Sequence, residues 1–326
     1  MKNNKDLTEQ NINLNYYSRQ IGTYGLETMM NKRKLNVFIY GMRGVGFEVS
    51  KNLILAGPKN VTIFDDNISK INDLTSNFYI TEEDVKNNKR RDISSYKKLS
   101  ELNHSVKVKI MEGNSMLTHI RNNLDSNDDE KYNVLVITEF LSKEIIIELD
   151  NLCRQNNIGF IYGTELGING FYFVDFGNSF NVLEIDNNND KFSISNIYKS
   201  NPGRITLINS IDGKLRNNDF IIFKDVEGMS ELNGKQFQIK YIDEYNISIQ
   251  DTSNYSDYIE GGYIQKVKIP LKMNFFPFEK KLEIPYSEED GYPFQIDFGK
   301  SCTNEIIHLG ILALYEFMEK KVIYQD

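Results

Sequence analysis

Cysteine and histidine are scarce in this sequence. There are two cysteines, Cys153 and Cys302, far apart in the chain, and three histidines, His104, His119 and His308. Neither set has the spacing of a disulfide framework or of a metal-ligand cluster. The sequence therefore excludes a disulfide-stapled secreted domain and predicts no metal site. So few cysteines are typical of a protein from a reducing intracellular compartment.

Long apolar runs and an excess of positive charge are also missing. No apolar run approaches the roughly 18–20 residues that a membrane-spanning helix needs, and the first fifteen residues lack the apolar core of a secretory signal. Lys and Arg number 38 against 46 Asp and Glu, for a net charge of -8. This mild acidic excess argues against non-specific binding to nucleic acid or to anionic lipid. We expect neither nucleic acid nor a membrane as a partner.

What the sequence does contain is an alternation of strands and helices. The 326 residues, 40% of them hydrophobic, are enough for two domains with a sizeable core. Short apolar runs alternate with stretches of helical periodicity, and continuous apolar strands between helices are typical of a parallel sheet covered on both faces. The expected strands are 37–40, 61–64, 106–111, 134–137 and 158–162, and the expected helices are 16–34, 47–55, 116–124, 144–155 and 303–321.

A glycine turn, GMRGVG at 41–46, follows the first expected strand. In nucleotide-binding turns the first glycine permits the tight turn, the second lets the backbone approach phosphate, and the third lets the helix pack on its strand. Gly41 and Gly46 fill the first and third positions, but Arg43 stands at the second. Donation from Arg43 to a phosphate is one interpretation; the simpler one is that Arg43 blocks ordinary nucleotide binding.

From residue 177 the pattern changes to short β-rich pieces separated by turns. We expect strands at 192–197, 203–208, 219–224, 236–241 and 248–251, with no convincing helix. This pattern predicts a small β-barrel inserted into the first domain. The predicted fold class is α/β, with a Rossmann-like, mainly parallel sheet from 1–176 that is completed by 269–326 and interrupted by the barrel at 177–268.

Several long motifs resemble one known family. Tyr17-Ser18-Arg19-Gln20 with Gly22 and Gly25, then GMRGVG, KNLILAG (51–57) and DLTSNFYITEEDV (73–85), resemble the N-terminal, adenylation-like half of ubiquitin-activating enzymes. VEGMSELNG (226–234) and DTSNYSDYIEGGYIQKVKIP (251–270) resemble that family's first catalytic-cysteine half-domain. The resemblance implies an inactive adenylation domain in 1–176 and 269–326, and this half-domain in 177–268.

The resemblance also implies that the nucleotide site has degenerated. Active adenylation domains of the family carry an acidic residue for the ATP ribose and an Asn-x-x-Arg pair for the phosphates. Here Asp65 matches the ribose acid, Asp73 and Ser76 replace the Asn and the Arg, and Lys89 matches a later phosphate lysine. Glu139-Phe140 replaces the Asp-Asn pair whose Asp holds magnesium. Asp65 and Lys89 are otherwise explained as solvated structural residues.

Arg19 is the one catalytic residue that the resemblance implies. The corresponding arginine of the family reaches the ATP phosphates of the neighbouring active domain, where a guanidinium stabilises developing negative charge. The alternative is an exposed arginine on a polar helix. The cysteines carry no such role: Cys153 lies on an apolar helix face, and Cys302, although near Lys300, does not match the catalytic-cysteine segment. His308 resembles a structural position of the family.

The resemblance gives the expected function. The chain is the N-terminal part of a ubiquitin-activating enzyme, inactive alone, which supplies half of the pseudodimer, an arginine in trans and part of the ubiquitin-binding surface. ATP and magnesium belong to the full-length enzyme, with no cofactor in this chain. The expected partners are the active adenylation domain and ubiquitin, and the expected location is cytoplasmic and nuclear.

Three alternatives stay open from the sequence. One is the smaller subunit of a SUMO- or NEDD8-type activating enzyme, against which the insertion speaks. Another is a non-enzymatic ubiquitin-binding scaffold. A dinucleotide oxidoreductase is poorly supported, because Arg43 blocks the turn and no acid–base pair is evident.

Overall fold

The computed structural model describes residues 15–182, 191–267, 271–283 and 304–323. The chain divides into two compact units, 1–179 with 274–326 and 180–273, where the sequence predicted boundaries at 176/177 and 268/269. Each unit has a hydrophobic core of its own: two apolar clusters lie in the first unit and one in the second. No helix in the described ranges has the length and apolar character needed to cross a bilayer.

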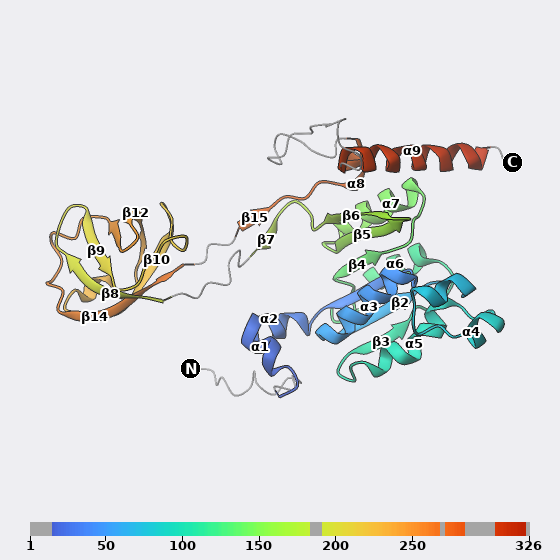
Figure 1. Cartoon of the computed structure of the whole chain (residues 1–326), viewed down its shortest axis with the longest axis horizontal. Helices are drawn as coiled ribbons and strands as arrows, with labels where there is room; N and C mark the ends of the chain where they lie inside the picture. Colours follow the sequence, from blue (N-terminus) through green and yellow to red (C-terminus); the bar gives the residue numbers. More distant parts are fainter. Residues whose placement is uncertain (1–14, 183–190, 268–270, 284–303, 324–326) are drawn as a thin grey trace. The chain divides into compact units, whose positions relative to one another are not determined.

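The first unit is built on a six-stranded sheet in the order β3-β2-β1-β4-β5-β6 (Figure 1). Its strands are β1 (Asn36–Tyr40), β2 (Asn60–Phe64), β3 (Lys107–Ile110), β4 (Val134–Ile137), β5 (Gly159–Leu166) and β6 (Asn169–Asp175). The first five are parallel and β6 is antiparallel to β5. The sequence analysis missed β6, because its alternation is interrupted by exposed aromatic residues such as Tyr172.

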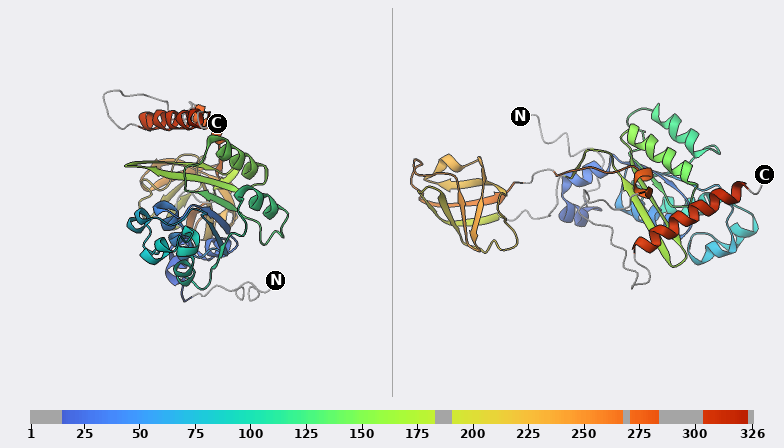
Figure 2. Two further views of the ribbon diagram at one scale, coloured as in Figure 1. Left: turned by 90° about the vertical axis from the view of Figure 1, so that its right-hand side faces the viewer. Right: turned by 90° about the horizontal axis from the view of Figure 1, so that it is seen from above.

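Helices flank this sheet (Figure 2). They are α3 (Gly44–Ala56), α4 (Glu82–Lys86), α5 (Arg91–Glu101), α6 (Met116–Leu124), α7 (Lys143–Gln155), α8 (Phe278–Glu283) and α9 (Asn304–Ile323), with a 3-10 turn η1 (Ile71–Thr75). Gly57 ends α3 in the left-handed conformation, as the Gly57-Pro58 signal predicts. The expected helix at 16–34 is instead two short helices, α1 (Ser18–Tyr24) and α2 (Leu26–Lys32), because Gly25 between them has φ of +82°.

The second unit contains a seven-stranded antiparallel sheet in the order β11-β10-β14-β8-β9-β13-β12. The strands are β8 (Lys191–Tyr198), β9 (Gly203–Leu207), β10 (Phe220–Glu227), β11 (Gln236–Gln238), β12 (Lys240–Asp243), β13 (Asn246–Ile249) and β14 (Glu260–Lys266). The outermost strands β11 and β12 are consecutive in the chain around the buried Ile239, which makes the sheet a nearly closed barrel. A short helical turn, η2 (Ser230–Leu232), is the only helix among the described residues of this unit.

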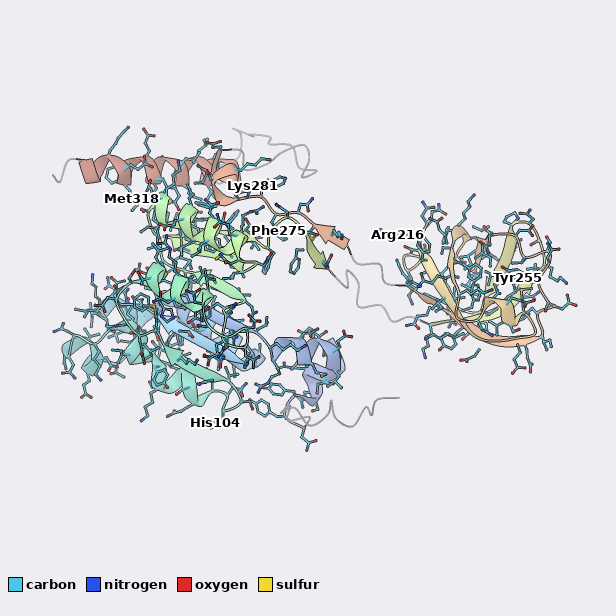
Figure 3. All side chains as sticks on the ribbon, turned by 180° about the vertical axis from the view of Figure 1, so that it is seen from behind. His104, Arg216, Tyr255, Phe275, Lys281 and Met318 are labelled. Carbon is cyan, nitrogen blue, oxygen red and sulfur yellow. The ribbon has the colours of Figure 1, made fainter. Side chains whose placement is uncertain are left out.

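Buried and exposed side chains alternate along the barrel strands, and the buried ones form the core of the barrel. In β8, Phe192, Ile194 and Ile197 point inward, with a bulge between Ile194 and Asn196 that accounts for the change of spacing. Figure 3 shows the side chains of this unit, including Tyr255, which packs against the same core. The strand pair β7 (Phe180–Val182) and β15 (Leu271–Met273) joins the outgoing and returning chain antiparallel to each other. The barrel predicted from the sequence is therefore confirmed, although β14 was not recognised as a strand.

Candidate functional site

The candidate site lies where the strand order reverses, at the carboxyl ends of β1, β2 and β4. Gly41 follows β1, Asp65 follows β2, and Glu139 stands two residues after β4. In parallel α/β sheets, ligands bind at this switch point because the connections that follow the two adjacent strands go to opposite faces of the sheet and leave a crevice between them. The fold thus brings together Gly41, Arg43, Gly46 and Asp65, which the sequence analysis singled out.

Close packing explains the two glycines of the turn. Gly41 has φ of +98°, and a Cβ there would lie 2.5 Å from Thr138 Oγ1. A Cβ on Gly46 would lie 2.0 Å from the carbonyl oxygen of Gly41. Arg43 is the residue before the first turn of α3, and its half-exposed side chain lies 3.9 Å from Glu139. These glycines are needed for the fold of the turn itself, with or without a nucleotide.

Asp65 holds the glycine turn in place. Its side chain is fully buried, and Oδ2 accepts a hydrogen bond from the backbone N of Met42 at 2.8 Å. Its Oδ1 accepts from the backbone and side-chain nitrogens of Asn67, both at 3.0 Å. The interpretation of Asp65 as a solvated end-of-strand residue is therefore wrong. The carboxylate is committed to protein donors, so a ribose hydroxyl would have to displace them.

A buried arginine occupies the middle of the site. Arg91, the first residue of α5, places Nε 2.9 Å from Asp73 Oδ2 and Nη1 3.5 Å from Asp65 Oδ2, with 8% of its side chain exposed. Burial disfavours the charged guanidinium, but the hydrogen bond that it donates to Asp73 and the charges of both carboxylates outweigh this effect and raise the pKa of Arg91. The negative charge of Asp73 is therefore compensated inside the protein.

The sequence analysis missed Arg91 because it did not recognise the helix at 91–101. Tyr96 and Leu99 face the core from this helix, and both pack in the cluster on that side of the sheet. Only these two apolar side chains mark the buried stripe, since Ile93, the other apolar residue of α5, is 48% exposed. The pair Arg90-Arg91 directly after Lys89 was the available signal.

Glu139 is the least satisfied charged group of the site. Its side chain is 15% exposed, and Oε1 has no hydrogen-bond donor among the described residues. Burial and the charge of Asp65 raise the pKa of Glu139 to about 7, against the opposite effect of Arg43 and Arg91. Burial, with Asp66, Asp65 and Glu139, likewise raises the pKa of Tyr40 to about 12. The potential in the site is therefore negative.

These residues do not fit a magnesium nucleotide. Ser76 stands where the resemblance implies a phosphate-binding arginine in active domains, and it packs against Gly44, at which an added Cβ would lie 3.0 Å from Ser76 Cβ. The charge of Arg91 is paired with Asp65 and Asp73. Within the described ranges no group of three or more His, Cys, Asp or Glu side chains is arranged to hold a metal ion.

Lys89 has its own partner in the loop after α4. Its Nζ lies 2.7 Å from Asp84 Oδ1, and its side chain is 44% exposed. Asp84 also accepts from Thr81, which caps α4. Lys89 thus serves the α4 cap in this structure.

Arg19 lies on α1, away from any partner side chain in the described part of the protein. It is exposed, and only its backbone oxygen is engaged, by Thr23 Oγ1 at 3.1 Å. Two residues earlier, Tyr17 is 1% exposed, and its hydroxyl accepts from Asn103 Nδ2 at 2.8 Å. Tyr17 also packs on Gly57, where a Cβ would come within 2.6 Å of the hydroxyl. Tyr17 therefore anchors α1 while leaving Arg19 free to contact another molecule.

A hollow of about 730 Å³ lies beside the candidate site on the outer face of α3. Val45, Val49, Leu53 and Phe78 give it an apolar surface, with Glu48 and Glu165 at its edge. Phe78 is 69% exposed although its ring contacts Phe47 edge-on. An exposed large aromatic side chain above an apolar hollow is typical of a protein-docking surface.

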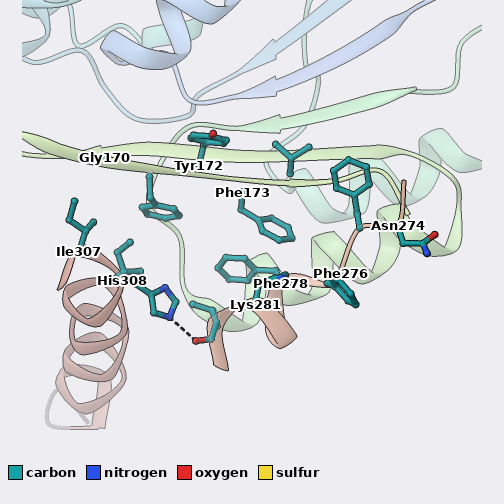
Figure 4. Close-up of a pocket in the computed structure, with 14 residues that line it drawn as sticks. Gly170, Tyr172, Phe173, Asn274, Phe276, Phe278, Lys281, Ile307 and His308 are labelled. Carbon is teal, nitrogen blue, oxygen red and sulfur yellow. Dashed lines mark hydrogen bonds between the residues drawn. The ribbon is translucent and has the colours of Figure 1, made fainter. Parts of the chain in front are cut away.

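A second cavity, of about 530 Å³, lies between β6, α8 and α9 (Figure 4). Its lining includes aromatic residues of β6 and of the segment before α8, together with residues of α8 and α9. His308 on α9 donates from Nε2 to the Leu282 carbonyl at 3.0 Å, so it serves to connect α9 with α8. This agrees with the structural role expected for His308.

Cys153, the cysteine in the described part of the chain, is not a candidate nucleophile. Cys153 is buried on α7, where burial and the charges of Asp150 and Asp175 raise the pKa of its thiol. The interpretation of Cys153 as a structural thiol is confirmed, since a nucleophile needs an accessible thiolate. Cys302 lies outside the residues that the structure describes.

Comparisons with known proteins match both units. A sequence model of the ThiF family matches residues 17–196, and one described as the ubiquitin-activating enzyme E1 FCCH domain matches residues 200–268. Ubiquitin-activating enzyme E1 2 of Arabidopsis thaliana is 35% identical over 96% of this chain and 28% of its own length. The human ubiquitin-like modifier-activating enzyme 1 is 34% identical over the same shares. The chain thus spans less than a third of these relatives.

Among solved structures, a crystal structure of E. coli MccB with succinimide is 20% identical, with a TM-score of 0.43, and the match covers 52% of this chain and 50% of that one.

Proposed function

The chain belongs to the ThiF family, and from that membership we propose that it is the non-catalytic, adenylation-like part of a ubiquitin-activating enzyme. The similarity to ubiquitin-activating enzymes runs over nearly the whole chain and includes the barrel. The observation that carries the non-catalytic assignment is Arg91, whose guanidinium pairs with Asp65 and Asp73 at the position where a nucleotide would bind. ATP and magnesium then act in another domain of the full-length enzyme, and we propose a cytoplasmic and nuclear location.

Nucleotide titration tests this assignment directly. We expect no heat of binding from ATP with magnesium up to millimolar concentration, because Asp65 is committed to Met42, Asn67 and Arg91 and the potential at Glu139 is negative. Micromolar binding by the isolated chain would contradict the proposal.

The same preparation, mixed with ATP and ubiquitin, should form no reductant-sensitive conjugate. A conjugate abolished by Cys302→Ala would show that the nucleophile is in this chain.

We propose that Arg19 acts in trans on ATP bound to the active adenylation domain. Its support is the anchoring of α1 by Tyr17 and the exposure of Arg19 two residues later. Adenylation develops negative charge on the departing pyrophosphate, so a preorganised guanidinium stabilises the transition state more than the bound substrate.

Pyrophosphate exchange in the full-length enzyme tests the role of Arg19. Arg19→Ala should slow exchange by roughly 10²–10³-fold, the effect of losing one preorganised donor. Arg19→Lys should recover only part of the rate, since a point charge lacks the planar guanidinium. Gln20→Ala, the next residue of the same helix, is the matched control. A rate for Arg19→Ala within about twofold of the unaltered enzyme would make Arg19 a surface residue only.

We further propose that the hollow on α3 docks the active adenylation domain. Its apolar lining and the exposed Phe78 support a protein partner there. Phe78→Asp should weaken association between this chain and a separately prepared remainder of the enzyme. Ile168→Asp, at a position that is 97% exposed on the β5–β6 turn, should not. The barrel is proposed to contribute to the ubiquitin-binding surface.

Two rival functions differ in testable ways. The smaller subunit of a SUMO- or NEDD8-type activating enzyme is disfavoured by the match of the barrel to the E1 FCCH domain. A non-enzymatic ubiquitin-binding scaffold would also fail to bind ATP. Only the proposed function makes the adenylation rate of a larger enzyme depend on Arg19.

A further inference from the structure

A buried pair of carboxylates lies where the chain leaves the first unit and returns to it. Asp150 on α7 and Asp175 at the end of β6 are each 1% exposed. They lie within hydrogen-bonding reach of each other. The positive group beside them is Arg154, one turn further along α7, which pairs with Asp175 Oδ2 at 2.5 Å.

This cluster contacts both the outgoing and the returning chain. Asp175 Oδ1 accepts from the backbone N of Gly177 at 2.7 Å, and Arg154 donates to the Phe275 carbonyl at 3.2 Å. Asp150 Oδ2 accepts from the backbone N of Phe278 at 2.7 Å, at the start of α8. Phe275, labelled in Figure 3, also donates its N–H to the Gly177 carbonyl at 2.9 Å. Side chains of one helix thus fasten the segment that returns from the barrel.

This cluster has two carboxylates for one guanidinium, and fewer hydrogen-bond donors than its carboxylate oxygens could accept. Asp150 Oδ1 has no hydrogen-bond donor among the described residues. Two ionised and buried carboxylates in contact, with one guanidinium that pairs with Asp175 alone, would repel each other strongly. A proton on one of them removes the repulsion and turns the contact into a hydrogen bond, as in other carboxyl pairs that share a proton.

We propose that Asp150 and Asp175 share a single proton, and that this proton holds residues 274–283 against α7, so that its loss loosens their attachment. The groups that face Asp150 are Asp175 from β6, Arg154 and the Cys153 thiol from α7, and the Phe278 amide from α8. The nearby lysines of α8, Lys280 and Lys281, place their ammonium groups over the Phe276 ring. The segment that follows the barrel, residues 274–283, is therefore held to α7 by a contact that depends on this proton.

The direction of the titration supports this arrangement. Burial raises the pKa of Asp150 to about 7, and Asp175 raises it further, against the opposite effects of the hydrogen bond from the Phe278 amide and of the Arg154 charge. The shared proton is then present at mildly acidic pH and lost as the pH rises through neutrality. This inference is independent of the proposed role in ubiquitin activation.

Hydrogen exchange on the whole chain tests the proposal. Between pH 6 and pH 8.5, after correction for the intrinsic exchange rate, amides of 274–283 should lose roughly tenfold or more of their protection. Asp150→Asn should abolish that loss, because its amide oxygen can accept from Phe278 while its amide nitrogen donates to Asp175 permanently. Glu139→Gln, which removes another acid of raised pKa remote from the junction, is the control and should leave the loss unchanged.

Two results would overturn the proposal. One is protection of 274–283 in the unaltered chain that does not change with pH; the other is the same loss of protection in Asp150→Asn. If that variant does not fold, infrared spectroscopy of the unaltered chain gives the answer. We expect the infrared band of a protonated carboxyl group at pH 6 and its disappearance by pH 8.5. The same change is expected in Glu139→Gln, in which Glu139 cannot contribute to the band. If Glu139→Gln lacks the band at pH 6, Asp150 and Asp175 do not share a proton.

Discussion

At the switch point of the sheet, two carboxylates of the chain itself lie beside Arg91, where an external anion would otherwise bind. A nucleotide brings negative charge to this position in a working site, and cations of the protein meet it there. Here the cation and its two carboxylate partners, Asp65 and Asp73, all belong to the chain. The turn after β1 is therefore held without a nucleotide, which suits a domain that serves as a structural partner.

Removing the Arg91 guanidinium should destabilise the first unit strongly. Arg91→Ala leaves two buried carboxylates without a cation, so we expect a loss of about 3–5 kcal/mol in the free energy of unfolding. Arg91→Lys should recover only part, because one ammonium cannot contact both Asp65 and Asp73. Urea unfolding measures the effect. Lys89→Ala, which removes a mainly exposed partner of Asp84, should leave the midpoint almost unchanged, and an equal loss in both variants would contradict this account.

Glu139 should make stability depend on pH. Its pKa in the folded state is raised to about 7, so the folded protein holds a proton that the unfolded chain releases near pH 4.5. Stability from this group is therefore full below about pH 4.5, falls as the pH rises towards 7, and is constant above. Glu139→Gln should be roughly 3 kcal/mol more stable than the unaltered chain at pH 8. The difference in unfolding free energy should vanish at pH 4.5; a difference that grows at acid pH would refute the assignment.

At the scale of elements, the surroundings of each segment decided its form. The apolar runs at 37–40, 61–64 and 134–137 became parallel strands because both faces of the sheet are covered. The helical region at 16–34 broke at Gly25, and the polar stretch at 91–101 became α5 because Leu99 and Tyr96 pack on α3 and the sheet. Tertiary contacts thus overrode the weak local signals in both places.

The attachment of α1 should depend on Tyr17. Tyr17→Ala removes a side chain that is 1% exposed and packs on Gly57, so α1 should detach locally while the sheet stays folded. We expect amide exchange in 18–24 to rise roughly tenfold or more, equivalent to at least about 1.4 kcal/mol of lost local stability, with β1 unchanged. Tyr16→Ala, at the neighbouring and 57% exposed tyrosine, is the control. Equal exchange in the two variants would show that Tyr17 is not the anchor.

At the scale of the whole molecule, the two units should fold independently. Phe180 and Met273 are directly opposite each other in the β7–β15 pair, so the ends of the insertion lie a few ångströms apart. Replacing 180–273 by a linker of roughly two to five residues should leave the first unit with cooperative unfolding. The excised segment should also fold alone, since its core is separate. Loss of cooperative unfolding in the shortened chain would mean that the barrel belongs to the core of the first unit.

The sequence by itself determined the class of the fold and the order of its parts. Hydrophobic periodicity, the glycine turn and the change of pattern near 177 specify a Rossmann-like sheet with a barrel insertion, because burial of apolar faces depends directly on such spacing. The same local information located Gly41, Arg43, Gly46 and Asp65 at one end of the sheet.

Only the tertiary structure decided what those residues do. The charge of Asp65 looked solvated in the sequence, yet it is buried and paired with Arg91, which lies 26 positions further along the chain. Asp150 and Asp175 likewise come from different elements, and nothing in the spacing of either predicts their contact. The protonation of a buried carboxyl depends on desolvation and on charges brought together by folding, and these are properties of the folded chain alone.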